Sequence, residues 1–184
     1  VFHDDLRYLV EAYFKASSRM VELGGFDFVA HLDKISMNGS LMDSTLTEQE
    51  WYNRLLWDYM SLIAEKGVMV EVNTKAYTKK GMMFPNVKYF KWLKELNIPV
   101  MVNSDAHLPQ LVNDNRALAF EWLREVGIKS TMRLHQGAWV EVPIDNKWLK
   151  IADWLKEMWE NSDFYELGKF LGEKLKEALD NIPW

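Results

Sequence analysis

"IPVMVNSDAH", residues 98–107, joins a short apolar run to a group of polar side chains, and it decides which fold we expect. The run at 98–102 is rich in branched apolar residues and ends abruptly at Asn103, which is typical of a buried strand in a parallel sheet. Asp105 and His107 follow directly. Polar residues at the carboxyl end of such a strand favour a ligand site, because these ends converge on a common edge.

Two earlier apolar runs, at residues 26–30 (FDFVA) and 68–72 (VMVEV), predict further buried strands. Apolar residues at helical spacing separate the runs and follow the last one, which predicts helices over 6–23, 52–65, 87–96 and 117–126. This alternation of helix and strand predicts an α/β fold built on a parallel sheet or barrel. Two short strand-like segments, 131–134 and 139–142, come last and flank a turn at Gln136-Gly137.

The composition changes at residue 145. Residues 145–184 are rich in tryptophan and carry two amphipathic patterns joined at Asn161-Ser162, which predicts a helical hairpin. We expect this hairpin to pack on the preceding domain or on a partner. The sequence therefore divides into a domain at 1–144 and an amphipathic helical extension at 145–184.

The overall composition excludes several classes of protein. Of 184 residues, 48% are hydrophobic and 27% charged, which is typical of a globular chain. A net charge of −5 without a basic run argues against nucleic-acid binding, and no apolar stretch approaches the length of a membrane span. The absence of cysteine excludes disulfides and thiolate chemistry and favours the cytoplasm. The first residue is Val1 rather than methionine, so we expect a processed, trimmed or excised segment.

Histidine and aspartate follow two of the predicted strands in the same pattern. His31 and Asp33 come just after the first strand, as Asp105 and His107 do after the third. A spacing of two on an extended chain points both side chains the same way. Imidazole and carboxylate together suit zinc, manganese or iron, so the pattern leaves two interpretations open, a metal site and a polar turn with nothing bound.

The middle strand contributes Glu71 and Asn73, which the alternation places at the same level as the two histidine–aspartate pairs. His3 and His135 are poorer candidates, because one lies near the terminus and the other in a turn.

Four segments in this order resemble PHP-domain histidinol-phosphatases: FDFVAHLDKISMN, GVMVEVNTKAY, IPVMVNSDAH and LHQGAWVEVPI. The resemblance is to the C-terminal portion of that family, and it covers residues 1–144 approximately. It implies a partial, distorted seven-stranded β/α barrel with divalent metals at the strand ends. It also implies hydrolysis of L-histidinol phosphate to L-histidinol and phosphate, a step of histidine biosynthesis.

The resemblance assigns roles to individual residues. His31, Asp105 and His107 match metal ligands, for manganese, zinc or iron, and Asp105 and His107 would also orient the attacking nucleophile. The remaining matches are Asp33 as a positioning acid, Glu71 and Asn73 as support for the site, and Lys34, which either faces the substrate phosphate or is solvated.

The chain also departs from the family, whose first strand carries an H-x-H pair of metal ligands. These 184 residues contain no H-x-H, and His3 is the sole histidine before His31. Three explanations follow: a fragment of a longer enzyme, a site completed by strands of a second chain, or an inactive remnant covered by the helices at 145–184. Two functions accordingly remain open. One is a metal-dependent phosphomonoester hydrolase acting on histidinol phosphate or another phosphomonoester. The other is a non-catalytic binding or structural module whose partner surface is the C-terminal helices.

Overall fold

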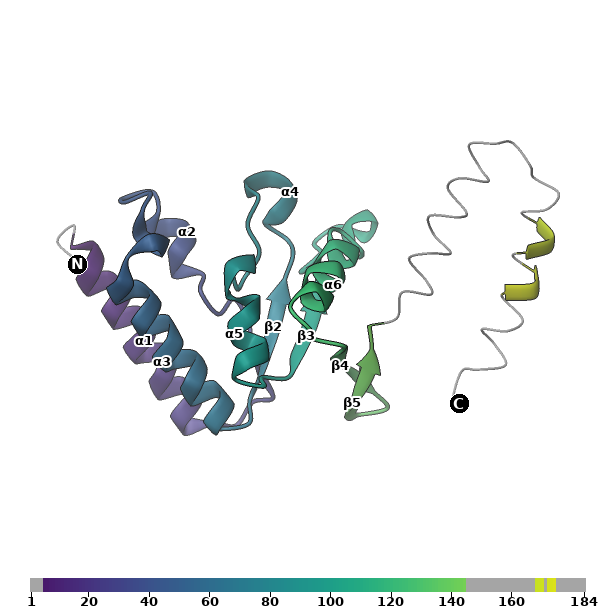
Figure 1. Cartoon of the computed structure of the whole chain (residues 1–184), viewed down its shortest axis with the longest axis horizontal. Helices are drawn as coiled ribbons and strands as arrows, with labels where there is room; N and C mark the ends of the chain where they lie inside the picture. The colour runs from purple at the N-terminus through teal and green to yellow at the C-terminus, as the bar shows by residue number, and fades with distance from the viewer. Residues whose placement is uncertain (1–4, 145–167, 171, 175–184) are drawn as a thin grey trace. The chain divides into compact units, whose positions relative to one another are not determined.

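The computed structural model of the chain describes residues 5–144, 168–170 and 172–174 (Figure 1). The chain divides into two units, residues 1–144 and residues 145–184. In the second unit the structure describes two short helical pieces, 168–170 and 172–174. The helical hairpin predicted for 145–184 otherwise lies outside the described residues.

The first unit contains the predicted helices and strands in the predicted order, together with two short helices, α2 and α4, that were not predicted (Figure 1). Its helices are α1 (Leu6–Leu23), α2 (Ile35–Gly39), α3 (Glu50–Glu65), α4 (Tyr77–Lys80), α5 (Phe90–Glu95) and α6 (Arg116–Glu125). Its strands are β1 (Phe28–Val29), β2 (Met69–Asn73), β3 (Val100–Asn103), β4 (Ser130–His135) and β5 (Ala138–Pro143). Single 3₁₀ turns, η1 (Leu46–Glu48), η2 (Val87–Tyr89) and η3 (Pro109–Leu111), complete the connections.

The first helix begins and ends where its sequence indicates. The Asp5 carboxylate accepts a hydrogen bond from the backbone N–H of Tyr8 at 2.9 Å and caps the N-terminus of α1. Gly24, with φ of 65° and ψ of −156°, ends the helix in a conformation that glycine adopts without strain. The helix predicted over 6–23 is therefore confirmed. No helix in the described part of the chain, α1 included, is long and apolar enough to cross a membrane.

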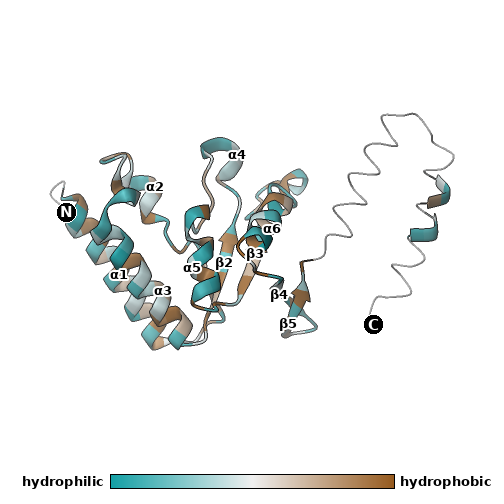
Figure 2. Ribbon diagram, viewed as in Figure 1, coloured by the Kyte–Doolittle hydropathy of each residue, from teal (hydrophilic) through white to brown (hydrophobic). Residues whose placement is uncertain are grey.

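The first three strands form one parallel sheet in the order β1-β2-β3, as predicted. Their register places Phe28 beside Met69 and Asn73 beside Asn103. Because side chains alternate along a strand, the two faces of the sheet differ in chemistry. One face presents valines, which pack with helical side chains into the core: Val29, Val70, Val72, Val100 and Val102. Figure 2 shows this apolar character in β2 and β3, against hydrophilic patches along α1, α3 and α5.

The opposite face of the sheet changes character along the strands. Phe28, Met69 and Met101 occupy its amino-terminal half, where the ring of Trp139 contacts Phe28 edge-to-face with centroids 6.0 Å apart. Glu71, Asn73 and Asn103 occupy its carboxyl-terminal half. The polar end of this face leads directly to the residues expected to form a site.

The seven-stranded barrel implied by the resemblance is wrong for this chain. The described residues form a three-stranded parallel sheet and a separate two-stranded antiparallel ribbon, β4-β5. The segments predicted at 131–134 and 139–142 pair with each other because Gln136 and Gly137, with φ of 48° and 81°, form a two-residue turn that reverses the chain. They therefore do not extend the parallel sheet, and β1 pairs with β2 over only two residues.

Candidate functional site

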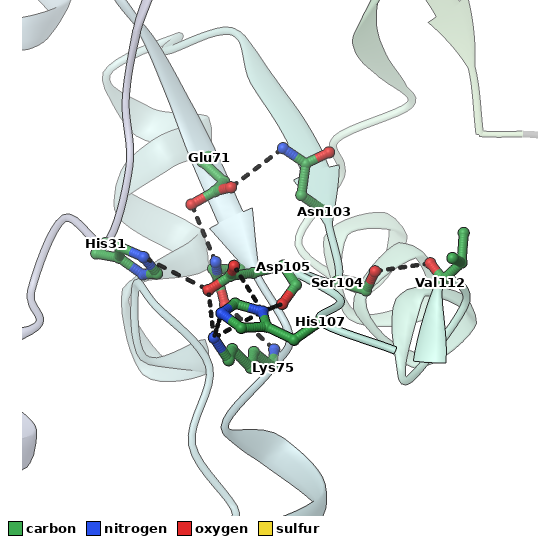
Figure 3. A network of polar contacts seen from close by, with 9 residues as sticks. His31, Glu71, Lys75, Asn103, Ser104, Asp105, His107 and Val112 are labelled. Carbon is green, nitrogen blue, oxygen red and sulfur yellow. Dashed lines mark hydrogen bonds and ion pairs between the residues drawn. The ribbon is translucent and has the colours of Figure 1, made fainter. Parts of the chain in front are cut away.

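The three parallel strands end at one edge of the sheet, and each is followed two residues later by a polar side chain. His31 follows β1, Lys75 follows the central β2, and Asp105 follows β3. Figure 3 shows these side chains directed toward one another from the three strand ends. The parallel sheet thus brings together residues that lie 30 to 74 positions apart in the sequence.

Two of these residues adopt an unusual backbone conformation. His31 and Asp105 have φ of 51° and 46°, in the left-handed region that non-glycine residues rarely enter. The other described non-glycine residues with positive φ are Asn97, Asn115 and Gln136. Left-handed residues of this kind cost about 1–3 kcal/mol each and concentrate at functional sites. The same unfavourable φ after both edge strands makes His31 and Asp105 candidates for a functional role.

Asp105 is the centre of the group. Its Oδ2 lies 3.7 Å from Nε2 of His31 and 3.2 Å from Nζ of Lys75, and its Oδ1 lies 3.7 Å from Nδ1 of His107. Partial burial of the Asp105 carboxyl raises its pKa, but the hydrogen bond and charge of Lys75, aided by Asn73 and His31, outweigh this and lower the pKa below its ordinary value. Asp105 is accordingly an anion at neutral pH.

The ring of His107 is oriented by the backbone. Its Nδ1 lies 2.9 Å from the carbonyl oxygen of Asp105, and a carbonyl can only accept a hydrogen bond. We therefore assign the proton of the neutral ring to Nδ1, which leaves the lone pair on Nε2. That nitrogen lies 3.1 Å from Nζ of Lys75. A carbonyl that holds Nδ1–H and leaves the lone pair on Nε2 orients many metal-binding histidines. Here the ammonium of Lys75 lies beside that nitrogen.

Glu71 lies behind this group on the central strand, and its side chain is almost fully buried. Oε2 accepts a hydrogen bond from Nδ2 of Asn73 at 3.2 Å, and Oε1 accepts one from Nδ2 of Asn103 at 3.1 Å. Asn73 in turn accepts the backbone N–H of Lys75 through Oδ1 at 3.2 Å. Glu71 and Asn73 therefore support the turn that carries Lys75.

This arrangement predicts that Asn103→Asp destabilises the protein by about 1–3 kcal/mol at pH 8. The substitution replaces the amide donor to Glu71 with a second carboxylate about 3 Å away, and two carboxylates that close cannot both ionise without cost. Urea unfolding at pH 8 measures the loss, with the exposed Asn38→Asp as control. Equal stability of Asn103→Asp and Asn38→Asp would contradict the explanation.

Asp33 and Lys34 do not join the group. Asp33 is fully buried, and its Oδ2 accepts the backbone N–H of Asn86 at 2.9 Å. Nζ of Lys34 lies over the ring of Phe84, 4.7 Å from its centroid. The expectation that His31 and Asp33 point the same way assumed an extended chain, but residues 31–34 form a turn, closed by a hydrogen bond from Lys34 N to His31 O.

An open cavity of about 350 Å³ lies beside Asp105 and is lined by His31, Glu71 and Arg116, among others. Arg116 begins α6, and its Nη1 donates to Oδ1 of Asn113 at 3.2 Å. The cavity thus combines carboxylates and an imidazole with a guanidinium, the group best suited to bind phosphate oxygens in pairs.

Sequence reasoning missed both cationic residues of the site, Lys75 and Arg116. The sequence pattern could have identified Lys75 as a site candidate, because it lies two positions after Asn73, as Asn73 does after Glu71. Nothing in the local sequence around Arg116 points to the strand ends, since α6 reaches them only through tertiary packing.

The donor types of the group fit a divalent metal, whereas their present positions do not form a closed site. Two imidazoles and one carboxylate are common ligands of zinc, manganese and iron. Nδ1 of His31 is buried without a hydrogen-bond partner among the described residues, so this nitrogen still has a donor or acceptor position to fill. As they stand, no three histidine, aspartate or glutamate side chains in the described ranges are placed to hold a metal ion.

Comparison with known proteins adds no assignment: neither a protein-family model nor a curated protein sequence matches the chain.

Proposed function

We propose that the group at the strand ends binds a divalent metal, manganese, zinc or iron, through His31, Asp105 and His107, and that it serves the hydrolysis of a phosphomonoester. The observation that carries the proposal is the position of Asp105 between two histidines from different chain segments. Its Oδ2 lies 3.7 Å from Nε2 of His31, and the ring of His107 is held through Nδ1 by the backbone of Asp105, which leaves Nε2 as the donor nitrogen. The orientation of His107 by a backbone carbonyl and the left-handed turns at His31 and Asp105 support it.

The residues have distinct tasks in this proposal. A bound divalent cation would neutralise phosphoryl oxygens and lower the pKa of water for attack on phosphorus. Arg116, which lines the cavity beside Asp105, would bind the phosphate through its guanidinium. Asp105, ionised at neutral pH, would hold the metal and orient the nucleophile. The substrate class, a phosphorylated small molecule such as L-histidinol phosphate, comes from the resemblance to PHP-domain histidinol-phosphatases.

Two further expectations belong to the proposal. The H-x-H ligands of the resembling family are not among these residues, and a second chain would supply them. A cytoplasmic location is proposed from the lack of cysteine in the 184 residues.

Metal titration of the 184-residue chain tests the proposal. Calorimetry with Mn²⁺ and Zn²⁺ should show about one site per chain, and His107→Ala and Asp105→Asn should each weaken binding at least tenfold because each removes one of few ligands. His135→Ala, in the β4-β5 hairpin, is the matched control and should bind as the parent chain does. Hydrolysis of L-histidinol phosphate, compared with p-nitrophenyl phosphate, then tests the substrate class. Binding that survives both site substitutions would overturn the proposed ligand set.

One observation favours the alternative of a non-catalytic module. The ammonium of Lys75 already lies between Asp105 and His107, so the charge of Asp105 is balanced without a metal. A chain in which neither Mn²⁺ nor Zn²⁺ binds would support this alternative.

A further inference from the structure

Lys75 occupies the centre of the strand-end group. It follows the central strand, between the histidine of one edge strand and the aspartate of the other. Its Nζ lies 3.2 Å from Oδ2 of Asp105 and 3.1 Å from Nε2 of His107 (Figure 3). The side chain is about half exposed, with a relative accessibility of 45%, so it can leave this position without disturbing the core.

The atoms that Lys75 contacts are the ones a metal would need. Nζ lies 3.1 Å from Nε2 and 3.2 Å from Nδ1 of His107, so the ammonium fills the space beside the ring that carries the donor nitrogen. Oδ2 of Asp105 lies close to both Lys75 and His31. An ammonium and a divalent cation a few ångströms apart also repel each other. Lys75 and a metal therefore compete for Asp105 and for the space beside His107.

We propose that Lys75 is an internal competitor for the metal site: its ammonium holds Asp105 and His107 in the absence of metal and is displaced when a divalent cation binds. The inference rests on the proposed function, because it requires that Asp105 and His107 are metal ligands. It predicts that the affinity of the chain for divalent metal is set by the charge at position 75 as well as by the ligands. Exchange of Lys75 for a neutral residue should therefore create a tighter site without any new ligand.

Calorimetric titration of the whole chain with Mn²⁺ and with Zn²⁺ tests this inference. Lys75→Met keeps the length and apolar stem of the side chain and removes the charge, and it should bind at least tenfold more tightly, equivalent to about 1.4 kcal/mol. Lys75→Arg keeps the charge and should stay within about threefold of the parent chain. Lys79→Met removes an equally exposed charge from α4, away from Asp105, and controls for net charge. The gain of Lys75→Met should also shrink at 1 M salt, because salt screens the charge that it removes.

The outcomes separate the inference from the proposed function. Equal affinity of Lys75→Met and the parent chain, with loss of binding in Asp105→Asn, overturns the role of Lys75 and leaves the metal site intact. The same gain in Lys79→Met as in Lys75→Met overturns it too, because net charge alone would then explain the effect. Binding that is insensitive to Asp105→Asn in every background overturns the metal site and the inference with it.

Discussion

Asp33→Asn is expected to stabilise the protein by about 4 kcal/mol above pH 7 and to have almost no effect near pH 4. The Asp33 carboxyl is fully buried, and its Oδ1 has no hydrogen-bond partner among the described residues. Burial raises its pKa from 3.8 to about 7, although the Asn86 N–H and the charge of Lys88 partly oppose this. The pKa of the Tyr13 hydroxyl is raised as well, to about 12, first by burial and then by the charge of Asp33.

The direction of the pH effect on stability depends on whether the folded or the unfolded protein holds the Asp33 proton. Between pH 4 and pH 7 the folded protein keeps the Asp33 proton, whereas the unfolded chain has released it. The free energy of unfolding therefore falls as the pH rises through this window and stays low above it. Each pH unit between the two pKa values corresponds to about 1.4 kcal/mol. An asparagine is neutral at every pH and still accepts the Asn86 N–H, so the variant should lose this part of the pH dependence.

Urea unfolding followed by circular dichroism at several pH values between 4 and 8 measures the effect. The exposed Asp58→Asn is the matched control and should change stability by less than about 0.5 kcal/mol across the range. A constant difference between Asp33→Asn and the parent chain at all pH values would show that Asp33 titrates at its ordinary pKa. The candidate metal site would be unaffected by that outcome, because Asp33 lies in the core rather than among the strand-end residues.

Phe14→Ala is expected to cost about 3–5 kcal/mol of stability, because it leaves a cavity at the contact between α1 and α3. Phe14 is 2% exposed, and its ring lies 5.8 Å from those of Tyr52 and Tyr59 of α3. Denaturant unfolding measures the loss. Leu23→Ala, also on α1 but 69% exposed, should change stability by less than about 0.5 kcal/mol.

The consequence of Phe14→Ala should reach the candidate site. Tyr13 directly precedes Phe14 in α1, and its hydroxyl donates to the backbone carbonyl oxygens of His31 and Leu32 at 3.2 and 3.3 Å. A loosened α1 would weaken these hydrogen bonds and the left-handed turn at His31 that they support. Metal affinity should therefore fall in Phe14→Ala and not in Leu23→Ala. A loss of less than about 1 kcal/mol would show that the surrounding rings close the cavity by repacking.

The order and type of the elements of the first unit could be predicted because they depend on local pattern. The bounds of the helix at 6–23 agree with the prediction, since the apolar spacing and the glycines that follow it act within a few positions. The three apolar runs became three parallel strands for the same reason. The Asp5 cap is a finding of the structure. Strand length was less predictable: the run at 26–30 shrinks to Phe28–Val29, because pairing with β2 covers only two residues.

The sequence by itself determined the alternation of helices and strands, the β4-β5 hairpin and the choice of His31, Asp105 and His107 as candidates. Only the tertiary structure decided that Asp33 enters the core, that Lys75 lies between Asp105 and His107, and that the described residues form two small sheets instead of a barrel. The physical reason is the distance along the chain over which each interaction acts. Helical periodicity and turn chemistry act over a few residues, whereas burial, ion pairing and sheet closure depend on segments that meet only after the chain has folded.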